Sequence, residues 1–377
     1  MTLHIFNPEH DIALASDLAC FTAPHAGRQL RHDLAFLPAL WAAPSDIIMA
    51  DDPLAVQHAL ERFAQYMHRS LGTRIDCGRQ WLQYGRDNAR SHAIEAVDPW
   101  GWDRALRARL ERCGLQGDTL PSDDALAAIR QLSHRGTSAK LLPRLRFEGT
   151  VGEAFECHSE EEVGELLCRY GRLVLKAPWS SSGRGIRFAG RTTGGDTLRE
   201  DESETMAYEL RRWLANVLAR QGSVMVEPYY NKVRDMAMEF RSDGQGKVDY
   251  LGLSLFHTSN GAYTGNIIAT EAVKRAMTAR YIQPLLLDKV RDAICSEMGP
   301  MLNGKYRGPF GVDMMIVHGQ QPALHPCVEI NLRRTMGHAA LMLTPTDDDI
   351  CRVMRIEYTG TYILKILKAS GGQALTT

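Results

Sequence analysis

Hydrophobic and polar residues in the first third of the chain follow two periods, one typical of strands and one typical of amphipathic helices. His4–Phe6 and Ile47–Met49 are short apolar runs that predict buried strands. Asp51–Met67 repeats apolar residues at helical spacing, and Ser122–Leu132 opens with a capping serine and two acids, so both segments predict helices. Residues 1–135 are therefore expected to form an N-terminal α/β domain.

Strand patterns separated by short turns dominate the rest of the chain. Alternating residues on either side of Ser242–Gly246 indicate a β-hairpin. Strands are predicted for Arg172–Lys176, Val224–Val226, Met236–Arg241, Lys247–Phe256, Phe310–Val317 and Cys327–Asn331. Helices are predicted near Ala139–Leu145, from Ser159 onward, and over Asp201–Gln221 and Asp288–Met301. The tail after Thr346 is predicted to be one helix with a frayed end.

Composition narrows the class of protein. The 377 residues carry a formal net charge of −1, with 44% hydrophobic and 24% charged residues, which excludes disordered, collagen-like and coiled-coil chains. The length indicates two or three domains. A near-zero charge argues against a general nucleic-acid binder. No apolar run is long enough to span a bilayer, and the start of the chain, with acids at Glu9 and Asp11, is unlike a signal peptide.

Cysteine and lysine usage indicate the redox environment of the protein and which basic residues deserve a functional explanation. The eight cysteines are scattered without a CxxC pair, so we expect buried, reduced thiols in a cytoplasmic protein. Only nine of the 44 basic residues are lysines, and none precedes Lys140. An ordinary surface charge is therefore a poorer explanation for a lysine in this chain than in most.

The most informative segment for chemistry is Leu173–Ile186. A strand that ends in Lys176 enters a loop of three serines and two glycines. Small residues let backbone N–H groups approach an anion, and the lysine adds a point charge at the base of the loop. This arrangement suits a triphosphate. The alternative is a solvent-exposed hairpin with an incidental lysine.

Two later strands place oxygen ligands in a row. Glu329, Asn331 and Arg333 alternate with apolar residues, so they project from the same face of their strand. If the strand that contains Asp313 pairs beside them, three oxygen donors converge in a set that suits Mg²⁺ bound jointly to nucleotide phosphates. The alternative is a half-buried strand with a solvated polar face.

A third segment, Val226–Tyr230, joins a strand to a proline-stiffened stretch with one acid. Such a hinge offers backbone groups and a carboxylate to the edge of an adenine ring. By itself the pattern also fits a plain strand end. In this order and spacing, however, the three segments and the intervening hairpin resemble the ATP-grasp superfamily of carboxylate–amine or carboxylate–thiol ligases. The resemblance covers residues from about 138 to 340.

The resemblance implies a role for individual residues. Phosphate binding is implied for Lys140, Lys176, Ser180, Ser181, Ser182, Gly183 and Gly185. Contacts to adenine and its nucleoside are implied for Glu227, Tyr229, Tyr230 and Asp235. Metal binding is implied for Asp313, Glu329 and Asn331. A catalytic role is implied for Lys176 and for Arg333, which matches a basic residue that stabilises transferred phosphate or a substrate carboxylate.

The resemblance also implies a fold and a reaction. The expected fold is an N-terminal α/β domain (1–135) followed by an ATP-grasp domain (136–345) with a nucleotide cleft between antiparallel sheets. The ATP-grasp part divides into a lid subdomain (136–226) and a metal-binding subdomain (227–345), and a helix and tail (346–377) complete the chain. The expected reaction is ATP-dependent ligation of a carboxylate, through an acyl phosphate, to an amine or thiol.

Cofactors and partners follow from that expectation. The cofactors are ATP and Mg²⁺, with two ions expected and Mn²⁺ as a substitute, and the partners are small-molecule or peptide carboxylates and amines. No nucleic acid or membrane partner is expected, and a homodimer is left open. A phosphotransferase on the same fold and a non-catalytic ATP-binding protein remain alternatives. Residues Asn7–Asp11 and Phe21–Arg31, together with His257, Asn260, Tyr263, Asn266 and Arg334, are candidates for the acceptor side.

Overall fold

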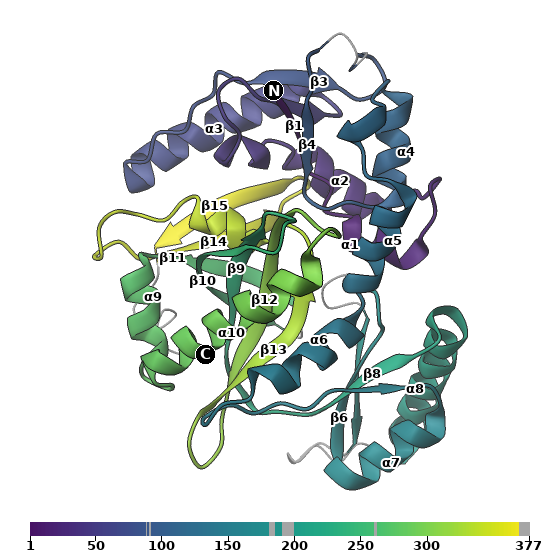
Figure 1. The fold of residues 1–377 in the computed structure, drawn as a ribbon. Coiled ribbons are helices and arrows are strands. Elements are labelled where there is room, and N and C mark those ends of the chain that lie inside the picture. The colour runs from purple at the N-terminus through teal and green to yellow at the C-terminus, as the bar shows by residue number, and fades with distance from the viewer. Residues whose placement is uncertain (88, 90–91, 181–184, 191–199, 260–261, 369–377) are drawn as a thin grey trace.

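The computed structural model organises the chain around three β-sheets, and it describes residues 1–87, 89, 92–180, 185–190, 200–259 and 262–368 (Figure 1). The first sheet is parallel and has the strand order β3-β2-β1-β4. Its strands are β1 (Thr2–Ile5), β2 (Ile47–Ala50), β3 (Gln80–Gln83) and β4 (Ala96–Pro99). The predicted N-terminal α/β arrangement is therefore confirmed.

Helices lie between and after these strands, and three of them begin with a capping Asp or Ser side chain. They are α1 (His10–Ser16), α2 (His25–Asp33), α3 (Pro53–Leu71), α4 (Arg104–Arg112) and α5 (Asp123–Leu132). The side chain of Ser122 accepts a hydrogen bond from the backbone of Ala125, as expected of a capping serine. Asp52 caps α3 in the same way, and Gly72 ends that helix in a left-handed conformation that glycine adopts without strain.

The central sheet has seven antiparallel strands in the order β13-β12-β9-β10-β11-β14-β15. They are β9 (Lys232–Ser242), β10 (Val248–Ser259), β11 (Ala262–Ile268), β12 (Gly308–Val317), β13 (Ala323–Asn331), β14 (Arg352–Tyr358) and β15 (Tyr362–Lys368). The predicted hairpin and the predicted β12–β13 pair are both confirmed. Three more helices pack with this sheet: α9 (Glu271–Thr278), α10 (Pro284–Leu302) and α11 (Met336–Leu341).

The expectation of a C-terminal helix is wrong, because the residues after Thr346 form β14 and β15 instead. Gly360 adopts a positive φ of 90° in the turn between these strands, a conformation that favours glycine. Met354, Leu364 and Ile366 then bury their side chains against α3 and the other helices of the N-terminal domain. The tail is therefore held in a sheet by a core that it shares with the first third of the chain.

A small antiparallel sheet with the order β5-β8-β6-β7 projects from the rest of the molecule together with its helices (lower right of Figure 1). Its strands are β5 (Phe155–Cys157), β6 (Arg172–Lys176), β7 (Ile186–Gly190) and β8 (Val224–Pro228). The helices are α7 (Glu160–Tyr170) and α8 (Glu200–Gln221). These elements have a hydrophobic core of their own. The predicted bounds of the two subdomains remain predictions.

Helix α6 (Arg135–Leu141) lies between the small sheet and β13. It begins four residues earlier than the predicted start at Ala139, and this difference brings Arg135 into the helix. All eight cysteines are free thiols. The expectation of buried thiols is confirmed for Cys113, Cys157 and Cys327 and is wrong for the exposed Cys20 and Cys168, while the other three are partly buried. Among the described residues, no helix is both long enough and apolar enough to cross a membrane.

Candidate active site

The predicted metal ligands lie side by side on β12 and β13. Asp313 pairs with Glu329 across the two strands, and Gly311 pairs with Asn331. The Asn331 amide donates a hydrogen bond to Asp313 Oδ2 over 3.1 Å. The antiparallel register therefore brings together the two acids and the amide that the sequence places 16 to 18 positions apart.

This carboxylate pair fits a divalent cation. Burial raises the pKa of Asp313 well above its usual range, and the neighbouring Glu329 and Glu239 charges raise it further. A bound cation would relieve that repulsion and keep both carboxylates ionised. The described residues contain no group of three His, Cys, Asp or Glu side chains that could hold a metal by themselves. Two acids and an amide instead suit Mg²⁺ that shares its coordination with phosphate oxygens.

Arg135 connects these acids to the loop after β6. Its Nη2 donates to Glu329 Oε1 over 2.9 Å, and its Nη1 donates to Ser180 Oγ over 2.7 Å and to the carbonyl of Ala177. The side chain is buried. Sequence reasoning did not single out this residue. One available clue is that a cation in the first turn of a helix opposes the helix dipole, so a buried arginine there requires carboxylate partners.

The glycine–serine loop after β6 is described only at its two ends, because Ser181, Ser182 and Gly183 lie outside the described residues. At the closing end, the carbonyl of Gly185 accepts a hydrogen bond from the Ala177 backbone. A Cβ at Gly185 would lie 2.2 Å from Ser180 Oγ, so only glycine fits there. At the opening end, Trp179 donates from its indole to the Arg130 carbonyl while the Arg130 guanidinium lies over its ring.

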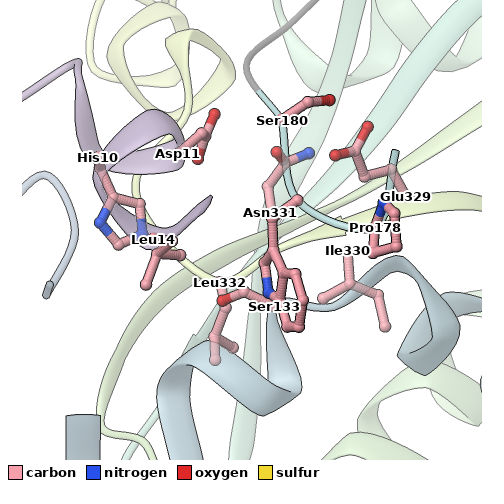
Figure 2. Close-up of a pocket in the computed structure, with 11 residues that line it drawn as sticks. His10, Asp11, Leu14, Ser133, Pro178, Ser180, Glu329, Ile330, Asn331 and Leu332 are labelled. Atoms are coloured by element: carbon pink, nitrogen blue, oxygen red, sulfur yellow. The ribbon is translucent and has the colours of Figure 1, made fainter. Parts of the chain in front are cut away.

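Polar side chains from three separate elements meet at the edge of β12 and β13, which carry the predicted metal ligands and are called the metal strands for that reason. Figure 2 shows Asp11 of α1, Ser180 of the loop, and Glu329 and Asn331 of β13 with their polar ends toward the same region. Ile330 points away from them, as strand alternation requires. The loop, the metal strands and the N-terminal domain therefore contribute to one site.

Lys176 and Glu227 form a buried ion pair inside the small sheet. Lys176 Nζ lies 2.6 Å from Glu227 Oε1, and both side chains are more than nine-tenths buried. The pairing follows from the adjacent antiparallel strands β6 and β8. The sequence assigned these residues to different parts of a nucleotide, and the structure places the two charges in direct contact.

The three other residues with a predicted adenine or nucleoside contact, Tyr229, Tyr230 and Asp235, each contact a different neighbour. The Tyr229 backbone N–H donates to the Arg172 carbonyl, and the Arg172 guanidinium lies 3.6 Å above the Tyr229 ring. The ring of Tyr230 packs edge-on against His325. Asp235 forms an ion pair with Lys232 over 2.5 Å and accepts a hydrogen bond from Thr258.

Lys140 does not join Lys176. It is exposed on α6 and lines a separate cavity of about 560 Å³ together with His134 and Trp179. Within the same helix, it is Arg135 that reaches the acids of β13. Lys140 therefore lies apart from the predicted metal ligands, and the phosphate-binding role implied for it stays a prediction.

Arg333 connects the metal strands to the N-terminal domain. Its Nε and Nη2 donate to the two carboxylate oxygens of Asp11 over 2.6 and 2.7 Å, and Nη2 also donates to Asn331 Oδ1 over 2.9 Å. Burial alone would raise the pKa of Asp11, but the Arg333 charge and hydrogen bonds outweigh it and lower the pKa. The bidentate pair fixes the position of α1 against β13.

A cavity of about 400 Å³ opens between the N-terminal domain and the central sheet, beside the metal strands. Its polar lining includes Glu9, Glu239, Ser254, Tyr263 and Asn266, and its apolar lining includes Phe6, Leu30, Trp100, Phe256 and Met336. Asp313, Glu329, Asn331, Arg333 and Arg135 form one wall of the same cavity. The two N-terminal segments that were candidates for the acceptor side, Asn7–Asp11 and Phe21–Arg31, both contribute to this lining. The residues are Pro8, Glu9 and Asp11 from the first segment and Pro24, Ala26, Gly27 and Leu30 from the second.

The other acceptor-side candidates divide into two groups. Tyr263 and Asn266 line the cavity. Arg334 pairs instead with Asp98 and lies over the Trp41 ring. His257 belongs to the opposite face of the sheet, because it shares the alternation of Leu253 and Leu255, which pack in the core. Asn260 lies outside the described residues.

Glu239 and His338 form a buried pair beneath the cavity floor. His338 Nδ1 lies 3.0 Å from Glu239 Oε2, and both side chains are almost fully buried. A Cβ at Gly337 would lie 1.9 Å from Glu239 Oε1, and one at Gly311 would lie 2.6 Å from Oε2. Two glycines therefore make room for this carboxylate beside the metal strands, which the sequence analysis did not foresee.

Comparison with known proteins adds evidence on the fold. No protein-family model and no curated protein matches the sequence. Among solved structures, the biotin carboxylase domain of Hydrogenobacter thermophilus 2-oxoglutarate carboxylase, in complex with MgADP, ADP and bicarbonate, aligns with 94% of this chain and 74% of its own. That alignment has a TM-score of 0.51 and 12% sequence identity.

The chain has the ATP-grasp fold. Two more ATP-grasp structures align over nearly the whole chain. N5-carboxyaminoimidazole ribonucleotide synthetase from Thermus thermophilus covers 100% of this chain and 95% of its own at 13% identity, with a TM-score of 0.48. Biotin carboxylase from Campylobacter jejuni covers 96% and 77% at 13% identity, with a TM-score of 0.49. The parallel N-terminal sheet and the two antiparallel sheets are consistent with that fold. At such low identity the alignment shows the fold alone, so the chemistry depends on this chain's own residues.

Proposed function

We propose that this ATP-grasp protein is an ATP-dependent ligase that activates a carboxylate and joins it to an amine. The observation that carries the proposal is the pairing of Asp313 with Glu329, with Asn331 beside them, on a strand pair that faces the loop after β6 and also borders the cavity. One set of side chains can therefore meet a nucleotide triphosphate on one side and an acceptor on the other.

The nucleotide side would be held by charge and by small residues. Lys176 and Arg135 supply two cations, and the loop that begins at Ser180 supplies backbone groups above the phosphates. Asp313, Glu329 and Asn331 would hold Mg²⁺, which neutralises phosphate charge when it is bound. Binding of phosphate would compete with Glu329 for Arg135, so this guanidinium is positioned to exchange one anionic partner for another.

The acceptor side would be the cavity of about 400 Å³ between the sheet and the N-terminal domain. A substrate carboxylate oxygen would attack the γ-phosphorus, and ADP would leave as the bond to the β–γ bridging oxygen breaks. The amine would then attack the acyl carbon, releasing inorganic phosphate and losing one proton. The acids that line the cavity favour a cationic amine on its way to that step, and Arg333 suits the carboxylate or the transferred phosphoryl group.

Calorimetric titration with Mg²⁺-ATP tests the nucleotide half of the proposal. Lys176→Ala should weaken binding by about 1.5–3 kcal/mol, because it removes a charged phosphate contact. Lys365→Ala is a matched control, since Lys365 pairs with Glu357 at the surface. A thermal melt of each variant separates lost binding from lost folding, because Lys176 also neutralises Glu227. Wild-type protein that binds no Mg²⁺-ATP, with or without candidate acceptors, contradicts the proposal.

Product analysis tests the ligase half. Pools of carboxylates and amines should give ADP and inorganic phosphate only when both substrates are present, together with an amide product detectable by mass spectrometry. Phosphorus NMR that shows a stable phosphorylated product, formed without any amine, would instead identify a phosphotransferase. Tight ATP binding without turnover of any pool would favour a nucleotide-binding protein that is not an enzyme.

A further inference from the structure

Four arginines are buried among the residues that the structure describes, and three of them have carboxylate partners. Within the described ranges, Arg31 pairs with Glu9 and Asp51, Arg135 pairs with Glu329, and Arg334 pairs with Asp98. Arg234 is as deeply buried as these three, with 4% of its surface exposed, yet none of the described acids lies within ion-pair distance of it. A buried charge without a counter-charge is costly, so it indicates a missing partner.

The polar atoms of Arg234 are also without hydrogen-bond partners. Nε and Nη1 are buried and neither has an acceptor among the described residues. Burial lowers the pKa of Arg234; Tyr281 opposes this shift, and the charge of a second cation, Arg280, adds to it. Both of these residues lie in the connection between α9 and α10. The neighbourhood of this guanidinium therefore supplies positive charge where a carboxylate would be expected.

Two more nitrogen-bearing side chains, those of His257 and Arg355, lie in the same row across the sheet. Phe256 pairs with Asp235, so His257 is next along the ladder toward Arg234, and His257 pairs with Gly265 of β11. Burial lowers the pKa of His257, and the charges of Arg234 and Arg355 lower it further while Asp235 opposes them, so the imidazole offers a hydrogen-bond donor to a ligand and no charge of its own. Arg355 Nε is likewise buried without a hydrogen-bond partner.

Gly265 leaves space for the Arg355 side chain beside His257. A Cβ at this position would lie 2.8 Å from Arg355 Cγ and 2.5 Å from the Met354 carbonyl. The stem of Arg355 therefore passes over β11 where no side chain blocks it. Register shifts interrupt the ladder between His257 and Thr258 on one side and between Ile316 and Val317 on the other. Such irregularities re-aim side chains and often accompany binding sites.

This row lies on the opposite face of the sheet from the candidate active site. Ala237 and Glu239 face the cavity, whereas Arg234 shares the alternation of Met236 and Met238, which pack in the core with α10. A ligand on Arg234 would therefore enter from the side of α9 and α10, and it would not compete with a nucleotide at Lys176.

We infer that Arg234, His257 and Arg355 form a second anion site, which takes a phosphate group. Two guanidinium groups and an imidazole match a dianion with several acceptor oxygens better than they match a single carboxylate. The ligand is inorganic phosphate or a small phosphate monoester. The inference is independent of the proposed ligase activity, because it rests on residues outside that site.

Thermal unfolding of the full chain in sodium phosphate, against sodium chloride of equal ionic strength, tests the inference. Phosphate should raise the Tm of the wild type above its value in chloride, because a ligand that binds only the folded state stabilises it. Arg234→Met should abolish this phosphate-specific shift. Lys176→Ala should keep it, which separates this site from the nucleotide site. Arg211→Met, at an exposed residue of α8, is the matched arginine control.

Direct titration makes the test independent of stability. Phosphate affinity measured by calorimetry should fall about tenfold or more in Arg234→Met and also in the milder variant Arg355→Gln. Repeating the titration with glycerol phosphate distinguishes a free phosphate from a monoester. Equal shifts in chloride and phosphate, an unchanged response in both arginine variants, or a response lost only in Lys176→Ala would each overturn the inference.

Discussion

The two faces of the central sheet treat positive charge in opposite ways. On the cavity face, Arg333 is held by Asp11 and Arg135 by Glu329. On the opposite face, which α9 and α10 cover and which is called the helix face below, Arg234 and Arg355 form no ion pair with any described acid, and the neutral imidazole of His257 lies between them. The difference teaches that burial of a cation is tolerated in two ways, by a partner within the chain or by a ligand from outside it.

The strongest test of the cavity face is Glu329→Gln. If Glu329 is a metal ligand, ATP turnover should fall by on the order of 10²–10³-fold, comparable to the loss of a major electrostatic contribution in other active sites. The measurement is ADP release at saturating Mg²⁺. Glu357→Gln, at a surface ion pair with Lys365, is the control. Unchanged turnover in Glu329→Gln would contradict the assignment of Glu329 as a ligand.

The next largest effect is expected from breaking the link between the domains. Asp11→Asn removes the charge that compensates Arg333, and the free energy of unfolding should fall by about 3 kcal/mol because a largely buried cation is left without its counter-charge. Chemical denaturation measures the change. The double variant Asp11→Asn/Arg333→Met should recover most of the loss, and a double variant as unstable as the single one would refute this explanation.

The buried ion pair of Arg334 with Asp98 allows a pH-dependent test of how much a carboxylate partner stabilises a buried arginine. Burial alone would raise the pKa of Asp98, but hydrogen bonds from His4 and the Arg334 charge outweigh it and lower the pKa to about 2. Because the folded-state pKa lies below the usual value, the ionised form stabilises the fold above about pH 4, and this contribution is lost as the pH falls toward 2.

Comparing wild type with Asp98→Asn should therefore show a difference of about 2 kcal/mol at pH 7 that shrinks as the pH falls from 4 toward 2. Denaturant titrations at several pH values measure this difference. Asp249→Asn is the control, because Asp249 forms an exposed pair with Lys247. A difference that stays constant with pH would show that Asp98 acts through packing instead of charge.

The smallest expected effect has the opposite sign and belongs to the helix face. In phosphate-free buffer, Arg234→Met should raise the free energy of unfolding by about 1 kcal/mol, because it removes buried polar atoms that lack partners. Arg135→Met should lower it, since Glu329 would lose its cation. If Arg234→Met destabilises the protein as much as Arg135→Met does, the two faces of the sheet do not differ in how they stabilise a buried arginine.

Local patterns in the sequence anticipated the elements around the candidate site. The strand Arg172–Lys176, the hairpin of β9 and β10, and the pairing of Asp313 with Glu329 follow from alternation and turn chemistry, which act over short stretches of chain. The prediction of a helix after Thr346 failed because the strands that form there depend on a core shared with residues 300 positions earlier. Local pattern does not encode a distant partner, so a helix was an equally good expectation there.

By itself, then, the sequence determined which residue types could meet a nucleotide and in which strands they lie. Tertiary structure decided which charges touch. It placed Arg135 instead of Lys140 against Glu329, paired Lys176 with Glu227, and set Asp11 on Arg333. It also left Arg234 without a partner on the far face. The physical reason is that a charge is stabilised by what lies within a few ångströms of it, and only folding brings those atoms together.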